Sequence, residues 1–195
     1  MCGGKSLFSI LRSMGGFSIL FFPFSSSSSF SFSCCIFLGE RCIMLAAVWN
    51  GDAKKVAELM KQDPGFDMNL DYGIGFTLLH YACIRARISA VIPLLLAHPD
   101  IDVNLKNTYG QTPFYLACCG RISCVREMLK DSRVKVNEPT NDGETPLYWA
   151  AVNGYLDVIQ WWIASGREMN LGEPGHYKSD AIGEAMKIGW AEVVT

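Results

Sequence analysis

The stretch TPLYWAAVNGYLDVIQWWIASG, residues 145–166, occurs in related form twice more in the same chain. The related stretches are TPFYLACCGRISCVREML, residues 112–129, and TLLHYACIRARISAVIPLLL, residues 77–96. Their first threonines are 35 and 33 residues apart, and each is followed five residues later by an alanine: Ala82, Ala117 and Ala150. Repetition at this period predicts an array of stacked units, each a small supersecondary motif.

The same register extends beyond these three stretches. An asparagine recurs at positions 69, 104, 137 and 170, while Ala47 and Ala185 each lie 35 residues from the nearest repeat alanine. Five units are therefore predicted, at about 41–70, 71–105, 106–138, 139–172 and, incomplete, 173–195. The outer two lack the Thr-Pro-Leu signature, as expected of terminal units that have only one neighbour.

Each unit predicts two short helices and a turn. Thr145 suits a helix N-cap, and a proline is tolerated in the first helical turn. Gly154 is expected to end the first helix, and apolar residues at helical spacing predict a second helix that ends at Gly166. We expect Ala150 at a crowded contact between units, Trp162 buried and Trp161 partly exposed.

Two features of the second unit disturb this pattern. Leu78 stands where the third and fourth units have proline, which predicts a looser start for its first helix. Pro93 lies inside the predicted second helix and is expected to kink that helix or delay its start.

A unit of this length, with two short helices and a turn, resembles the ankyrin repeat. The resemblance is carried by DGETPLYWAAVNGYLDVIQWWIASGREMN (142–170), YGQTPFYLAC with VKVN (109–118, 134–137) and GFTLLHYAC with IDVN (75–83, 101–104). It covers residues 42–195 and implies an all-α solenoid of stacked helix-turn-helix units joined by β-turn or hairpin loops. It also implies that His80 hydrogen-bonds the threonine and the neighbouring turn; tyrosines replace this histidine at positions 115 and 148.

The first 40 residues differ in composition from the rest. Eight of the 11 phenylalanines lie in the first 38 residues, and no charged residue occurs from Ser13 to Gly39. We therefore divide the chain into a Phe/Ser-rich segment, 1–40, and a repeat domain, 41–195. Three interpretations of the segment stay open: a disordered tail or translated pyrimidine tract, a membrane anchor within residues 13–39, or a signal peptide.

Charge and cysteine content narrow the class of protein. A formal net charge of −2, with scattered Lys and Arg, argues against a nucleic-acid binder. None of the eight cysteines forms a CxxC pair, and Cys83, Cys118 and Cys119 are expected in helices among apolar residues. The chain is expected to be reduced, cytoplasmic and monomeric, with a membrane-anchored form as the alternative location.

No catalytic, metal or cofactor site is predicted. His98 and His176 lie in loops, Asp100 and Asp102 are expected to face solvent, and the spacing of Cys118, Cys119 and Cys124 fits no zinc pattern. Phosphate-binding glycine motifs are lacking from the sequence. We therefore expect no enzymatic activity and no small-molecule substrate.

The resemblance implies a protein–protein interaction module that binds its partner on a concave face. Contacts are implied at turn tips (Ile74, Phe76, Thr108, Tyr109, Gln111, Asn141, Asp142, Glu144) and at first-helix ends (Trp49, Asn50, Ile84, Arg85, Cys119, Val152, Asn153). The partner is expected to carry apolar anchors at one end and Lys or Arg at the other. The alternatives are that Trp49 and Phe76 only shield the first units, and that the chain is a targeting module of a larger enzyme or a membrane-tethered adaptor.

Overall fold

The computed structural model describes residues 32–85 and 90–170, which form helices joined by turns, without a strand. The chain divides into two compact units, residues 1–35 and 36–195, and the second holds the repeats. The helices are α2 (Phe32–Asn50), α3 (Ala53–Gln62), α4 (Leu78–Ile84), α5 (Val91–Leu96), α6 (Pro113–Ala117), α7 (Ile122–Leu129), α8 (Pro146–Val152) and α9 (Leu156–Ser165).

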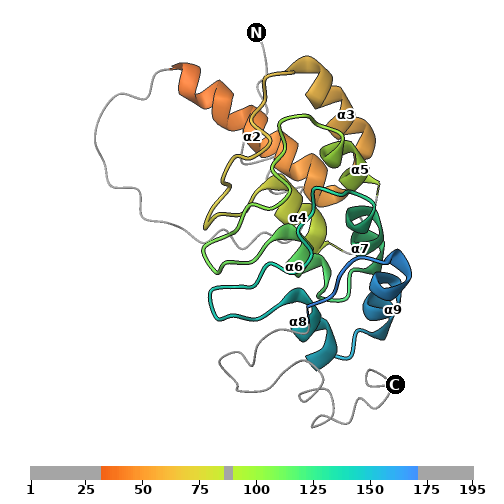
Figure 1. Ribbon diagram of the computed structural model, residues 1–195. Coiled ribbons are helices and arrows are strands. Elements are labelled where there is room, and N and C mark those ends of the chain that lie inside the picture. Colours follow the sequence, from red (N-terminus) through yellow and green to blue (C-terminus); the bar gives the residue numbers. More distant parts are fainter. Residues whose placement is uncertain (1–31, 86–89, 171–195) are drawn as a thin grey trace. The chain divides into compact units, whose positions relative to one another are not determined.

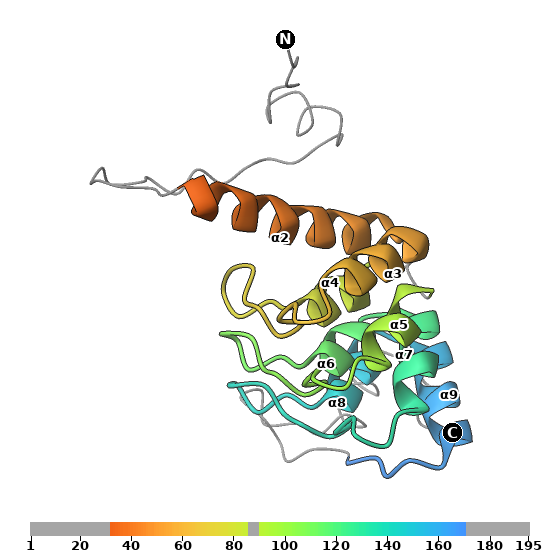
Figure 2. The same cartoon turned by 90° about the horizontal axis from the view of Figure 1, so that it is seen from above.

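The helices of the repeats lie in two rows. The first helices of the second to fourth units, α4, α6 and α8, follow one another in one row, and α5, α7 and α9 follow one another beside it (Figures 1 and 2). Contacts run along each row, α4 to α6 to α8 and α3 to α5 to α7 to α9, and between the two helices of each of these units. The predicted all-α stack of helix pairs is confirmed for the described residues.

The first helix, α2, is longer than the sequence suggests. It runs from Phe32 to Asn50 and so crosses residue 40, where we predicted the domain division. Among residues 32–85 and 90–170, no helix is long and apolar enough to cross a membrane. Residues 13–31 of the candidate anchor, the incomplete fifth unit at 173–195 and His176 lie outside the described residues.

The helix starts follow the threonines. The Oγ1 atoms of Thr112 and Thr145 accept a hydrogen bond, each of 3.1 Å, from the backbone N–H three residues later. At Leu78, where we expected a looser start, α4 begins without a hydrogen bond of the N-cap type to the Thr77 side chain, yet it is as long as α8, seven residues each. The second unit has no proline after its threonine, but the ring of His80 contributes to the helix start: its Nδ1 lies 3.1 Å from the Thr77 N–H.

Pro93 sits in the first turn of its helix. Because α5 begins at Val91, the missing N–H of Pro93 needs no acceptor, and no kink is required. Gly154 and Gly166 follow the ends of α8 and α9 with positive φ, as predicted.

Cys118 and Cys119 were predicted in a helix, and this is wrong. The first helix of the third unit, α6, is only five residues long, and Cys118 is its C-cap. Burial still agrees with the sequence: Cys83, Cys118 and Cys124 are fully buried, and burial raises the pKa of each thiol. They pack as small apolar groups.

The repeated asparagines form a ladder of side-chain hydrogen bonds between units. Asn104 shows the pattern: its Nδ2 donates to the carbonyl of Arg133 at 2.9 Å, and its Oδ1 accepts from the N–H of Lys135 at 2.7 Å. Asn69 makes the same two bonds to residues 100 and 102, and Asn137 makes them to residues 168 and 170. Each asparagine thus satisfies one carbonyl and one N–H of the next unit, which explains its spacing in the sequence.

The repeat alanines lie at the contacts between helices. Ala82, Ala117 and Ala150 have no exposed surface, and Ala47 is 6% exposed. Replacing Ala150 with leucine is expected to lower the free energy of unfolding by about 1–3 kcal/mol, because the added methylenes overpack a filled site. Chemical denaturation measures this loss.

Ala164→Leu is the matched control for Ala150→Leu. It adds the same atoms to an exposed position of α9 and is expected to leave the unfolding midpoint nearly unchanged. Equal stability of the Ala150→Leu variant and the parent would show that the register of the repeats is misplaced.

Candidate protein-binding surface

The turns before α4, α6 and α8 form a row of tips on one side of the helices (Figures 1 and 2). Each tip is closed by one backbone hydrogen bond between residues four apart, from Tyr72 to Phe76, Asn107 to Gln111 and Thr140 to Glu144. These bonds are 2.9, 3.0 and 2.9 Å long. The tips of the third and fourth units share a second bond, from Gly110 to Asn107 and from Gly143 to Thr140, whereas the tip of the second unit differs in backbone conformation, because Gly73 and Ile74 have positive φ.

Neighbouring tips are bonded to one another. The Thr108 N–H donates to the Ile74 carbonyl at 3.1 Å, and the Asn141 N–H donates to the Tyr109 carbonyl at 3.1 Å. The Asn141 amide also donates to the Thr108 carbonyl at 2.8 Å. The row of tips is consequently a preordered surface, which loses little conformational entropy on binding.

Close approach between tips requires glycine at position 75. Its φ is +77°, and a Cβ there would lie 2.8 Å from the Cα of Asn107 in the next tip. A side chain would therefore be strained and would also push the tips apart. The spacing of these two tips therefore depends on this glycine as well as on the hydrogen bonds.

Apolar side chains gather at the end of α2, in the first unit, and at the tip of the second unit. Ile74 is 53% exposed, while Trp49 and Phe76 are half-buried. The Phe76 ring lies 5.6 Å from Tyr81, whose ring lies 6.0 Å from Trp49. Trp49 and Phe76 thus pack into the array and still present part of their surface.

The tip of the fourth unit, before α8, is polar and acidic. Asn141 and Asp142 are exposed, whereas Glu144 is half-buried and accepts a 2.9 Å hydrogen bond from the Tyr115 hydroxyl. Burial, with Glu144 as the next cause, raises the pKa of Tyr115. The carboxylate of Glu144 is therefore held in place by the preceding unit.

The tip of the third unit, before α6, carries both aromatic and polar side chains. Tyr109 is 56% exposed and Thr108 is exposed, but Gln111 is half-buried and bonded to the Asn107 amide at 3.0 Å. The Gln111 carbonyl also lies 3.2 Å from Nε2 of His80. Thr108 and Tyr109 are the accessible members of this tip.

The predicted helix-end residues lie at or just beyond the ends of the first helices. Trp49 and Asn50 end α2, Ile84 and Val152 are the last residues of α4 and α8, and Arg85 and Asn153 are the C-caps. Cys119 lies in the turn after α6. Of these, Asn50, Arg85 and Asn153 are exposed and the others are half-buried.

Three residues of this surface escaped the sequence analysis. Tyr81, Leu116 and Trp149 each precede the repeat alanine and lie three residues before Ile84, Cys119 and Val152; Tyr81 and Trp149 thus share a helix side with Ile84 and Val152. All three are half-buried. Their signal was the large apolar residue before each of these alanines, which is easily taken for core.

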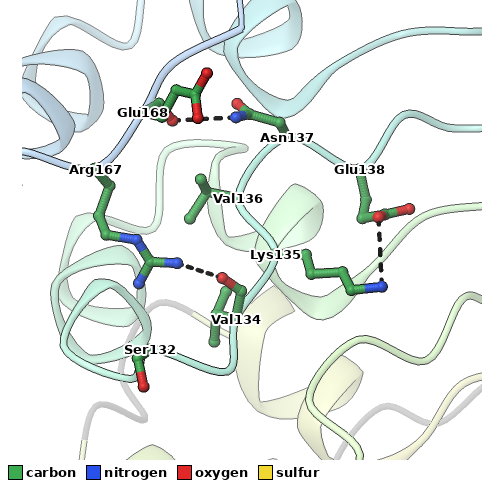
Figure 3. A pocket seen from close by; sticks show the side chains of 8 residues that line it. All are labelled: Ser132, Val134, Lys135, Val136, Asn137, Glu138, Arg167 and Glu168. Atoms are coloured by element: carbon green, nitrogen blue, oxygen red, sulfur yellow. Dashed lines mark hydrogen bonds and ion pairs between the residues drawn. The ribbon is translucent and has the colours of Figure 1, made fainter.

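A pocket of about 400 Å³ lies among the loops that follow α7 and α9. It is lined by Ser132, Val134, Lys135, Val136, Asn137, Glu138, Arg167 and Glu168 (Figure 3). The Arg167 guanidinium donates to the carbonyls of Leu129, Asp131 and Val134, so its donors already serve the backbone. The arginine has a structural role here.

Comparison with known proteins agrees with this architecture. The model of the family described as ankyrin repeats (3 copies) matches residues 43–138 and 91–172. The human SMC5-SMC6 complex localization factor protein 1 is 40% identical over 93 residues, 47% of this chain and 9% of that protein. Human Rabankyrin-5 is 29% identical over 68% of the chain and 11% of its own length. Pig NF-kappa-B inhibitor alpha is 28% identical over 70% of the chain and 45% of its own length.

The chain covers only about a tenth of the first two of these relatives. The family match nevertheless extends over two-thirds of the present sequence and over all the repeats that the structure describes. With the paired helices, the repeated threonine caps and the asparagine ladder, it establishes that the chain belongs to the ankyrin repeat family.

Proposed function

We propose that this chain is a non-catalytic interaction module that binds a segment of a partner protein along the row of tips and first-helix ends. Ankyrin repeats generally mediate protein–protein interaction. The observation that carries the proposal is the division of this row into an aromatic end, around Trp49 and Phe76, and an acidic end, at Asp142 and Glu144. A matching segment carries apolar anchors at one end and Lys or Arg at the other.

The geometry supports this division of roles. Aromatic side chains that are partly packed lose little rotamer entropy on binding and serve as hot spots. Glu144 is oriented by Tyr115, so its carboxylate is in place before a cation arrives. Relatives named as a complex localization factor and as an NF-kappa-B inhibitor are consistent with action on other proteins.

We also propose that the protein works in a reducing compartment, the cytoplasm. The free thiols of Cys83, Cys118 and Cys124 are buried in the core, which suits a chain that folds without disulfides.

The test of the binding surface is affinity capture with quantitative mass spectrometry, comparing the parent with two double variants. Trp49→Ala/Phe76→Ala removes the aromatic end, and Asp142→Lys/Glu144→Lys reverses the acidic end. Each folded double variant is expected to lose most of the signal of the same partner, because truncating hot spots and reversing charges each cost more than tenfold in affinity.

Matched controls come from the second helices. Trp161→Ala/Ile163→Ala removes exposed apolar surface from α9, and Glu58→Lys/Asp157→Lys reverses two exposed charges on α3 and α9. Both controls are expected to retain the partner. Full retention of every partner by the two folded surface variants would show that the binding face lies elsewhere.

A further inference from the structure

Arg85 is a surface cation held in position by an aromatic ring. Its guanidinium carbon lies 4.1 Å from the centre of the Trp49 ring, and its Nε lies 3.4 Å from the Trp49 carbonyl oxygen. The residue is the C-cap of α4 and is exposed. A cation–π contact of this kind restrains a long side chain that would otherwise sample many rotamers.

The outer two nitrogens of this guanidinium have no protein partner in the part of the chain that the structure describes. Within residues 32–85 and 90–170, no carboxylate lies in ion-pair contact with Arg85, and no carbonyl accepts from Nη1 or Nη2. The neighbouring Arg121 differs in exposure: its Nε also donates to a carbonyl, that of Ile84 at 2.8 Å, but its side chain is half-buried. Arg85 thus offers a planar pair of donors beside the aromatic end of the row.

We infer that Arg85 is the receptor for an acidic side chain, Asp or Glu, next to the apolar anchor of the bound protein segment. A planar guanidinium pairs with a carboxylate through two parallel hydrogen bonds, and the contact with the Trp49 ring restrains the Arg85 side chain in advance. Phosphate recognition commonly gathers several arginines, whereas among the described residues a single guanidinium, that of Arg85, lies over the Trp49 ring.

This inference rests on the proposed function and extends it. The partner segment then carries charges in a fixed order. Its acidic residue faces Arg85, next to the apolar anchors on Trp49 and Phe76. Its basic end meets Asp142 and Glu144. Opposite charges at the two ends of one surface set the direction in which a segment can lie, because the reversed orientation brings like charges together.

The test uses the full chain and a random peptide library displayed on yeast. Peptides selected on the parent are expected to carry Asp or Glu beside an apolar residue and Lys or Arg toward the other end. Changing the acidic residue of a selected peptide to its amide is expected to weaken binding by about tenfold. Arg85→Glu is expected to lose the same peptides and to select Lys or Arg at that position.

Arg126→Glu is the matched control, because the Arg126 guanidinium also lies 4.1 Å over a tryptophan, Trp161, but on α7 among the second helices. It is expected to keep every selected peptide. Arg85→Lys retains the charge without the planar donors and is expected to bind more weakly than the parent. Thermal unfolding of all three variants establishes that they are folded.

Three results would overturn the inference. If selected peptides respond to Asp142→Lys/Glu144→Lys but show no acidic preference that changes with Arg85→Glu, the receptor role fails while the proposed function stands. If phosphoserine in place of the acidic residue binds more tightly, the site is one for phosphate. If no peptide responds to either surface double variant, the proposed function and the inference fail together.

Discussion

Replacing Trp162 with alanine is expected to lower the free energy of unfolding by about 3–5 kcal/mol, the range for removing a large buried aromatic. Trp162 has no exposed surface, and its ring meets Phe114 edge to face, with centroids 5.0 Å apart. The pair joins α9 to α6, in the preceding unit, so the loss falls on an interface between units. Urea denaturation followed by circular dichroism measures it.

Trp161 provides the internal comparison. It is 41% exposed and its ring is covered by the Arg126 guanidinium, so Trp161→Ala is expected to cost clearly less than Trp162→Ala. Trp162→Phe is a second variant, since it keeps an aromatic ring and removes an indole N–H that has no acceptor among the described residues. Equal losses at positions 161 and 162 would mean that α9 is rotated from its place in the structure.

Acid is expected to destabilise this protein through His80. The Thr77 N–H lies 3.1 Å from Nδ1 of His80, so Nδ1 accepts, and the Nε2–H donates to the Gln111 carbonyl at 3.2 Å. Burial lowers the pKa of His80 from 6.5 to about 4. The folded chain therefore keeps this ring neutral at a pH where the unfolded chain protonates it.

The sign follows from that difference in bound protons. Between pH 6.5 and about 4 the unfolded state binds the proton and the folded state does not, so stability falls as the pH falls. The expected loss from His80 is about 2–3 kcal/mol between about pH 7 and pH 4.5. The hydrogen bond to Arg133 lowers the pKa of Asp131, so protonation of this carboxylate changes the stability at lower pH, outside this interval.

His80→Tyr isolates the effect. The third and fourth units carry tyrosine at this position, and the Tyr115 hydroxyl reaches Glu144, the counterpart of Gln111 in the next tip. The variant is expected to show a much flatter dependence of unfolding free energy on pH above about pH 4.5. The slope is the observable, because a constant offset in stability between the two proteins leaves it unchanged. Parallel curves for parent and variant would refute the role of His80.

The helical pairs, the period and the orientation of α9 could be predicted because each follows from local pattern. The caps at Thr112 and Thr145 and the burial of Trp162 depend on residues a few positions apart. The long α2 could not be predicted in the same way, because the repeat register says nothing about residues before the first unit. The start of α4 depends on His80, which bonds a threonine three residues earlier.

The candidate surface was harder to predict than the fold. The repeat register locates the tips, but it does not show that Glu144 is bonded to Tyr115 or that Arg85 is stacked on Trp49. Both contacts join residues 29 or more positions apart. Tyr81, Leu116 and Trp149 were missed because a half-buried apolar residue beside a buried alanine has the same sequence signature as core. The assignment of the whole row to partner binding stays a prediction.

The asparagine ladder has a consequence for how chains of this kind fold. Its bonds join residues 29 to 33 positions apart, whichever pair of units is considered. A longer array built on the same ladder therefore closes no longer loops than a short one, and its relative contact order falls as units are added. Because folding rates decrease with contact order, such a protein can lengthen its surface without the kinetic penalty that large sheets incur.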